Sequence, residues 1–351
     1  MANDANNIPT QKGLRVLMIS GDPKALSTES GVYKRLLLQA AQVDWLEVFV
    51  RGESIDTPLG DQGIVRGFAG SKFAVAREMV NLALQEKFDV ITTQDPFFLG
   101  LIGWRIAQKI GTRLQLQMHT DIFSSAFSGF SRKLLAKYLL RRADSVRVVS
   151  EHIRQSLERL HLCARVSVLP VFIDEDAIRG AVAVDLKRIY PQFSQIVLVA
   201  ARLEREKHVD AIIRAMPKIV VAFPRVGFLI AGSGSQKEVL IALTHHLGIA
   251  KQVIFLGHRD DVFSLYKESD CVIAATAPYE GYGAGTVEAL AAGAPVVSAD
   301  VGVAREAGAI IVKSRHYSEA VIRVLENETR GVLQFQLPSA EEWARQWHDT
   351  L

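Results

Sequence analysis

The sequence has few cysteines, and their spacing fits none of the common cysteine-based architectures. Its 351 residues contain two, Cys163 and Cys271, each in an apolar setting. Two cysteines without metal-ligand spacing argue against a disulfide scaffold and against a structural zinc site. We expect both to be buried thiols in a reducing compartment.

Long apolar runs are also missing. The polar stretch 1–13 lacks the apolar core of a signal peptide. The longest apolar candidate, residues 96–110, is interrupted by Arg105, Gln108 and Lys109, and it is shorter than the ~18 apolar residues of a membrane helix. We therefore expect a cytoplasmic protein, or one that is peripheral on the cytosolic face of a membrane.

Several chemical motifs are absent as well. No Gly-x-Gly-x-x-Gly follows the first apolar run, which disfavours a dinucleotide-dependent dehydrogenase. No Asp-x-Asp stands at a predicted strand end, so we expect no metal and no cofactor. The net charge of +3 is small, and it gives no reason to expect a nucleic-acid partner.

What the sequence does contain is a regular alternation of apolar runs and amphipathic stretches. The predicted strands are 15–20, 45–50, 88–93, 114–118, 145–149 and 165–171, then 195–201, 226–232, 252–256, 271–277, 295–299 and 309–312. Alternation with helices at this rhythm is typical of parallel doubly wound sheets, which bind ligands beyond the carboxyl ends of their strands. We predict an α/β fold with an N-terminal domain over 1–174 and a C-terminal domain over 175–337.

The C-terminal stretch 338–351 is expected to be a helix that docks back on the first domain. Ser339 would cap it, with Glu342 as the partner three residues on. Trp343 and Trp347 supply the apolar surface for docking.

The stretch 278–297 holds the densest set of candidate site residues. A glycine-rich turn over 281–285 leads into a helical pattern over 286–292. Bare glycine backbone and the positive end of a helix dipole suit a phosphate. Glu280 and Glu288 bracket this turn, and carboxylates suit hydroxyl groups. The combination predicts a ligand with both phosphates and hydroxyls, that is, a sugar nucleotide.

These residues resemble a known signature. Gly-Tyr-Gly after Glu280, and Glu-Ala-Leu-Ala-Ala-Gly-Ala-Pro-Val-Val from Glu288, are similar to the motif of the family-four retaining glycosyltransferases of GT-B fold. The similarity extends over about 16–347. It implies two Rossmann-like domains facing a central cleft. It also implies transfer of a sugar from a nucleotide-diphosphate sugar to a hydroxyl acceptor, with retention of configuration. Because the Asp-x-Asp motif is missing, we expect this transfer to be metal-independent.

The resemblance further implies roles for individual residues. Glu280 and His119 would be the catalytic residues beside the donor sugar. Arg202 and Lys207 would hold the donor diphosphate, and two converging cations do neutralise such a leaving group. The other donor-binding residues would be Glu288 at the ribose, Gly31, Gly283, Ala284, Gly285 and Thr286 at the phosphates, and Gly257 and His258 beside the base.

The chain departs from the family pattern where Ser30, Ala201 and His208 stand in place of glycines. Two alternatives therefore stay open: a sugar-nucleotide epimerase of GT-B architecture, and a non-catalytic sugar-nucleotide-binding subunit. The acceptor would be a glycan, a lipid-linked molecule or a small molecule, in glycan biosynthesis such as that of a cell-envelope polysaccharide.

Residues 130–142 form a basic amphipathic pattern, with Leu134, Leu135, Tyr138 and Leu139 on one face. This helix could rest on an anionic membrane, or pack on its own sheet as an ordinary surface helix.

Overall fold

The computed structural model describes residues 13–124, 127, 129–313 and 316–351, and the chain divides into two compact units. Unit 1 holds the described residues of 1–119, 128–172 and 338–351. Unit 2 holds those of 120–127 and 173–337. The chain enters unit 2 briefly after His119, passes into it again between Phe172 and Ile173, and returns to unit 1 at Pro338.

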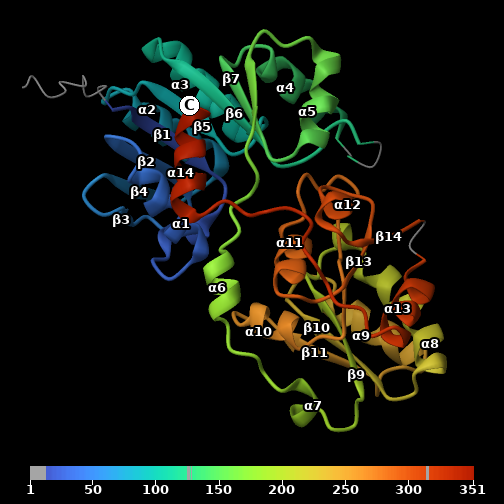
Figure 1. The fold of residues 1–351 in the computed structure, drawn as a ribbon. Helices are drawn as coiled ribbons and strands as arrows, with labels where there is room; N and C mark the ends of the chain where they lie inside the picture. Colours follow the sequence, from blue (N-terminus) through green and yellow to red (C-terminus); the bar gives the residue numbers. More distant parts are fainter. Residues whose placement is uncertain (1–12, 125–126, 128, 314–315) are drawn as a thin grey trace, which may run out of the picture. The chain divides into compact units, whose positions relative to one another are not determined.

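Unit 1 is built on an eight-stranded sheet of order β3-β4-β2-β1-β5-β6-β7-β8, in which only β3 is antiparallel to its neighbour (Figure 1). Its strands are β1 (Arg15–Ser20), β2 (Trp45–Arg51), β3 (Asp56–Pro58), β4 (Gly63–Phe68), β5 (Val90–Thr93), β6 (Arg113–Met118), β7 (Ser145–Val148) and β8 (Arg165–Val168). Its α-helices are α1 (Gly31–Ala40), α2 (Lys72–Ala83), α3 (Phe98–Ile110), α4 (Phe130–Leu140), α5 (Glu151–Leu157) and α14 (Ala340–Asp349).

Strands β3 and β4 were not predicted from the sequence. The first is short, begins at Asp56 and ends at Pro58, and the second contains two glycines, all of which weaken a strand pattern. Pairing with β2 supplies what local preference lacks, because β4 lies directly beside that buried strand.

Helix α14 lies in the core of unit 1. Trp343 and Trp347 are fully buried in one apolar cluster with residues of β1, β2 and α1. The indole of Trp343 also donates to the Pro170 carbonyl at 2.9 Å. Ser339 caps the helix by accepting from the Glu342 N–H at 3.2 Å, as its position predicts. Large buried aromatic side chains dominate such contacts.

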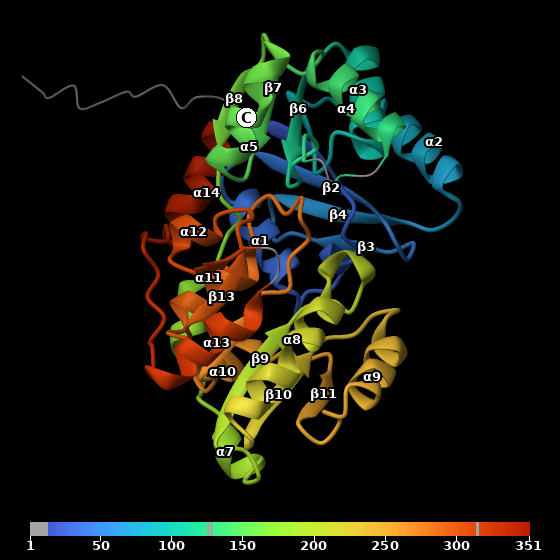
Figure 2. The same cartoon turned by 90° about the vertical axis from the view of Figure 1, so that its right-hand side faces the viewer.

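Unit 2 contains a six-stranded parallel sheet of order β11-β10-β9-β12-β13-β14, and Figure 2 shows β9, β10 and β11 side by side. Its strands are β9 (Gln195–Ala200), β10 (Val226–Ala231), β11 (Val253–Gly257), β12 (Cys271–Ile273), β13 (Val296–Ala299) and β14 (Ile310–Val312). Its α-helices are α6 (Glu175–Gly180), α7 (Leu186–Ile189), α8 (Val209–Ala222), α9 (Lys237–His246), α10 (Val262–Lys267), α11 (Ala284–Ala291), α12 (Ala304–Ala307) and α13 (Tyr317–Glu326). A short 3-10 turn, η3 (Arg205–Lys207), precedes α8.

The order of this sheet reverses between β9 and β12, since the chain winds outward from β9 first through β10 and β11 and then through β12 to β14. Doubly wound sheets bind ligands at such a reversal, outside the carboxyl ends of the strands. Helix α13, which packs on α8, was not anticipated from the sequence. Neither were α6 and α7.

The two cysteines differ from expectation. Cys271 is buried in β12 as predicted, but Cys163 is exposed, so the prediction for Cys163 is wrong. It follows the turn after α5, where the chain has left the sheet. Of the helices that the structure describes, none combines the length and the apolar character that crossing a bilayer requires.

Candidate functional site

A cavity of about 240 Å³ in unit 2 lies at the reversal between β9 and β12. Its walls come from the segments that follow these two strands and from the first turn of α11. The residues that line it include Ala201, Arg202, Lys207, Tyr266, Thr276, Glu280, Gly283, Ala284, Gly285 and Thr286. The structure thus brings together predicted site residues from two separate stretches of unit 2, 202–207 and 280–286.

The start of α11 offers backbone donors to this cavity. Gly283 precedes the helix at φ 88°, a left-handed conformation that favours glycine, and no side chain caps the helix. The first N–H groups of a helix have no partner inside it, and they lie at the positive end of its dipole. Ala284 and Gly285 therefore present a site that suits an anion such as a phosphate.

Lys207 and Glu280 form an ion pair in the same cavity. The Lys207 Nζ lies 2.6 Å from the Glu280 Oε2, with 17% and 25% of the two side chains exposed. The same carboxylate accepts from the Ala277 N–H at 3.4 Å. The pair joins the turn after β9 to the turn after β12, and it places a cation and a carboxylate within reach of one ligand.

Arg202 lines the cavity from the edge. Its guanidinium is 68% exposed and pairs with Glu206 at 3.3 Å. Exposed ion pairs of this kind contribute little to stability. Arg202 can therefore turn toward an anionic ligand at small cost, which would place a second cation beside Lys207.

The carboxyl group of Glu288 is held by α11 in a half-buried position. Burial raises its pKa from the usual 4.5 to about 7. The charged form also raises the pKa of the Tyr266 hydroxyl, after burial as the larger cause. Burial removes water from this carboxyl group. Hydroxyl groups of a ligand would stabilise its charged form, because they replace the hydrogen bonds of the lost water.

This shift gives a prediction for stability. A pKa that is higher in the folded state than in the unfolded chain stabilises the fold at low pH, and that stability is lost as the pH rises from about 4.5 through about 7. We expect Glu288→Gln to stabilise the protein at pH 8 relative to wild type, by about 2–3 kcal/mol more than at pH 5. Urea unfolding of both proteins at the two pH values measures this difference. An equal effect at both would contradict the shift.

Thr120, Asp121 and Phe127 contact the loop that carries Glu280, and the sequence did not predict this. Thr120 forms a β-bridge with Glu280, and the Asp121 N–H donates to the Tyr279 carbonyl at 3.1 Å. The rings of Phe127 and Tyr279 meet edge to face at 5.7 Å. These contacts fix the backbone at Glu280 from outside the cavity.

Besides Glu288, which is not among the residues that line the cavity, two more predicted residues of unit 2 lie elsewhere. Gly257 ends β11 at φ 73°, and its carbonyl accepts from the Gly232 N–H at 2.7 Å. His258 lies 3.3 Å from Asp260 and is exposed. Neither lines the cavity at the reversal. His208, at a position where the family has a glycine, adopts φ 51°, a conformation that glycine would enter without strain.

The remaining predicted residues, Gly31 and His119, belong to unit 1. Gly31 is exposed and begins α1, which Ser30 caps by accepting from the Tyr33 N–H at 3.0 Å. His119 follows β6, with its Nε2 3.4 Å from the Gln117 Oε1. The surrounding protein, and then the positive charges of Arg147 and Arg35, lower the pKa of His119. The residue is exposed, and solvent moderates this shift. The neutral imidazole is therefore favoured.

Comparison with known proteins agrees with this architecture. Residues 190–336 match the family described as Glycosyl transferases group 1, and residues 47–177 match the one described as Glycosyltransferase Family 4. Among solved structures, an Anabaena protein, HepE, crystallised with UDP-glucose, superposes with a TM-score of 0.72 at 19% identity over 96% of each chain. The chain has the GT-B fold, with two α/β units that are each built on a largely parallel sheet.

The chain is also similar to curated glycosyltransferases. A D-inositol 3-phosphate glycosyltransferase from Mycolicibacterium smegmatis is 33% identical over 222 residues, 58% of this chain and 50% of the relative. An alpha-monoglucosyldiacylglycerol synthase from Streptococcus pneumoniae is 28% identical over 250 residues, 66% of this chain and 56% of the relative. The matched region thus spans about half the length of these relatives. The chain belongs to the family-four, group 1 glycosyltransferases.

Proposed function

We propose that the protein transfers a sugar from a nucleotide-diphosphate sugar to a hydroxyl acceptor, with retention of configuration and without a metal. The observation that carries this proposal is the Lys207–Glu280 pair, 2.6 Å apart in the cavity at the sheet reversal. Few ligands use a cation, a carboxylate and bare helix amides together, and a sugar diphosphate uses all three.

In this mechanism the diphosphate lies against the start of α11, with Lys207 and Arg202 on its oxygens. These cations stabilise the charge that develops on the leaving group as its bond to the sugar breaks. Glu280 binds a sugar hydroxyl and favours the positive charge at the anomeric carbon. Glu288 accepts hydrogen bonds from the ribose hydroxyls. The acceptor reacts from the face that the diphosphate leaves, and a departing phosphate oxygen takes the acceptor proton.

The other predicted roles are part of the same proposal. His119 would contact the donor sugar, and Gly31 the donor phosphates, when unit 1 and unit 2 close on the donor. Gly257 and His258 would border the base. Uridine is the base to test first, because the Anabaena neighbour was crystallised with UDP-glucose. The proposed location is the cytoplasm.

A thermal-shift screen against UDP-, GDP- and ADP-sugars tests donor binding, because a ligand that binds only the folded state raises the melting temperature. We expect the sugar nucleotides of one base to raise Tm, and we expect the double variant Arg202→Met/Lys207→Met to abolish this rise. Incubation with donor alone should leave the sugar unchanged apart from slow hydrolysis. No rise with any donor would contradict the proposal, and inversion of a sugar centre would identify an epimerase instead.

The acceptor side includes contact of α4 with an anionic membrane in this proposal. The buried face of α4 is Ala136, Leu139 and Leu140, whereas Phe130 is 78% exposed, and Leu134 and Tyr138 are also exposed. The Arg142 guanidinium lies over the Tyr138 ring. Exposed apolar side chains beside cations suit an anionic lipid surface. The streptococcal relative is named for a diacylglycerol product.

Vesicle sedimentation tests this contact. The double variant Phe130→Ser/Leu134→Ser should bind vesicles of anionic phospholipid about tenfold more weakly than wild type, since each apolar side chain loses its burial in the interface. Val221→Ser, an exposed apolar residue of α8, is the matched control and should bind like wild type. Equal binding by all three proteins would contradict the proposed contact of α4 with the membrane.

A further inference from the structure

Unit 1 has a second polar cavity, of about 120 Å³, beside His119. Its polar lining residues are Arg35 and Gln39 from α1, and Gln94, Gln117, His119 and Arg147 from the carboxyl-end region of β5, β6 and β7. This edge includes the neighbouring strands β1 and β5, at which the order of the eight-stranded sheet reverses. The volume exceeds the roughly 30 Å³ share of one water molecule several times over, so it can take a small polyatomic group.

Arg147 is the most unusual residue of this cavity. Only 4% of it is exposed, although it is a charged side chain in the middle of a strand. Its Nη1 donates to the Gln117 Oε1 at 3.1 Å, and its guanidinium lies 5.7 Å from the Trp343 ring centroid. Its Nε is buried and has no hydrogen-bond partner among the described residues. Buried arginine donors are almost always satisfied.

The cavity also lacks a countercharge. None of the described residues that line it is a carboxylate, and Arg35 contributes a second cation. Burial lowers the pKa of Arg35, and the charge of Asp22 offsets this only in part. Burial, and then the charge of Arg35, lower the pKa of Arg147. The two cations thus repel each other, and no acidic side chain among the described lining residues balances their charge.

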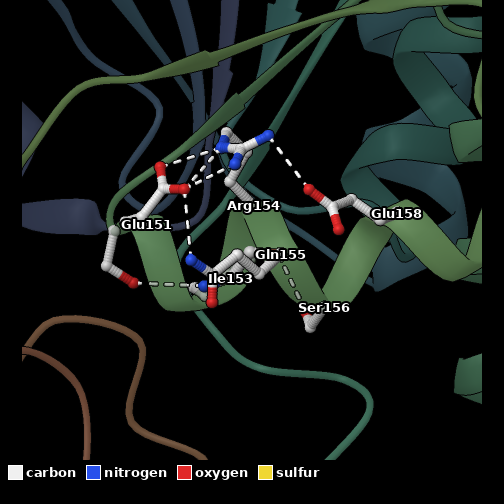
Figure 3. Close-up of polar contacts among 7 residues, drawn as sticks. Glu151, Ile153, Arg154, Gln155, Ser156 and Glu158 are labelled. Carbon is white, nitrogen blue, oxygen red and sulfur yellow. Dashed lines mark hydrogen bonds and ion pairs between the residues drawn. The ribbon is translucent and has the colours of Figure 1, made fainter.

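Arg154, in the neighbouring helix α5, shows the usual arrangement. Its guanidinium is held between two carboxylates, with Nε 2.8 Å from Glu151 and Nη1 3.3 Å from Glu158 (Figure 3). The half-buried Arg154 therefore has two acidic partners, whereas the buried Arg147 has none among the described residues. A buried charge without a partner destabilises a fold, so Arg147 is better explained as half of an interaction than as support for the sheet.

We propose that Arg147 and Arg35 bind an oxyanion group, a phosphate or a carboxylate, carried by the acceptor substrate. The assignment of this anion to the acceptor rests on the proposed function, whereas the existence of an anion site does not. An oxyanion would fill the free donor position of Arg147 and supply the missing negative charge. Gln94 and Gln117 can donate amide N–H groups to it. The anion would then hold the acceptor beside His119.

Binding of free anions tests the site without any donor. Inorganic phosphate and acetate are titrated calorimetrically into full-length Arg202→Met/Lys207→Met, a background that disables the cavity of unit 2. We expect saturable binding of at least one of the two anions, and the preferred anion identifies the group. Adding Arg147→Met should weaken that binding by about tenfold or more, and Arg35→Met should weaken it as well. Arg154→Met is the matched control and should change nothing.

Stability separates this role from a structural one. In anion-free buffer Arg147→Met should melt no lower than its parent, because it removes a buried charge without a partner. Absence of any anion binding, or affinity for the anion that is unchanged in Arg147→Met, would overturn the proposal. If Arg147→Met fails to fold, Arg35→Met decides alone, and unchanged affinity there overturns it.

The link to the acceptor has its own readout. Small polyols and their phosphate or carboxylate derivatives are compared as acceptors with one donor, and we expect turnover of the anionic forms. Arg35→Met should raise KM for that acceptor by about tenfold and leave the KM for donor unchanged. Exclusive use of uncharged acceptors would overturn the assignment while leaving the proposed transferase intact. Absence of all transfer, with anion binding intact, would instead count against the proposed function.

Discussion

Glu280→Gln should lower kcat by roughly 10²–10³-fold, the usual loss when one group that stabilises transition-state charge is removed. The amide keeps the shape of the side chain but cannot favour positive charge at the anomeric carbon. It also releases Lys207, whose Nζ lies 2.6 Å from this carboxylate. UDP, which lacks the sugar, should therefore bind Glu280→Gln as tightly as wild type, or more tightly.

Initial-rate kinetics and calorimetric titration of UDP measure the two effects separately. Glu204→Gln is the matched control. This carboxylate lies in the same loop as Lys207, binds Ser235 at 2.7 Å and does not line the cavity. It should show near-normal kcat. A kcat for Glu280→Gln within a few-fold of wild type would reject the role assigned to Glu280.

Lys207→Met should lower both donor affinity and kcat/KM, the latter by roughly 10²-fold or more. In the proposed mechanism the lysine donates a charge-assisted hydrogen bond to the diphosphate and offsets the negative charge that grows as the bond to the sugar breaks. The variant also leaves Glu280 half-buried with no cation beside it. We therefore expect UDP to bind at least tenfold more weakly, in contrast to Glu280→Gln.

The double variant Lys207→Met/Glu280→Gln makes the contrast sharper. Because the two side chains contact each other, their effects should not add. Restoring neutrality should recover part of the UDP affinity lost in Lys207→Met. Lys218→Met, on the exposed surface of α8, is the control for loss of a lysine. UDP affinity that is unchanged in Lys207→Met would contradict the assignment of Lys207 to the diphosphate.

Much of the fold could be predicted because buried parallel strands show as plain apolar runs. The strand at 15–20 has the predicted bounds, and most others differ by one or two residues at their ends. The failures share a cause. Strands β3 and β4 carry residues that disfavour strands. Strand β4 forms by pairing with β2, and β3 forms by pairing with β4. Tertiary pairing overrides local preference in such places.

For the candidate site, local motifs marked Glu280 and Lys207, but nothing local says that they touch. They are 73 residues apart in the chain, and the reversal of the sheet between β9 and β12 joins them. The contacts of Thr120, Asp121 and Phe127 with the loop that carries Glu280 could not be predicted for the same reason. Arg147 could have been singled out from the sequence, because it is a charged residue between two valines of a predicted strand.

The position of a bound nucleotide tests the account most directly. A crystal structure with UDP should place the diphosphate in the cavity at the β9–β12 reversal. Its oxygens should lie within hydrogen-bond distance of the Lys207 Nζ and of the first N–H groups of α11, and its ribose should lie against Glu288. A diphosphate bound anywhere else, with Lys207 and Glu280 still paired and the start of α11 untouched, would contradict it.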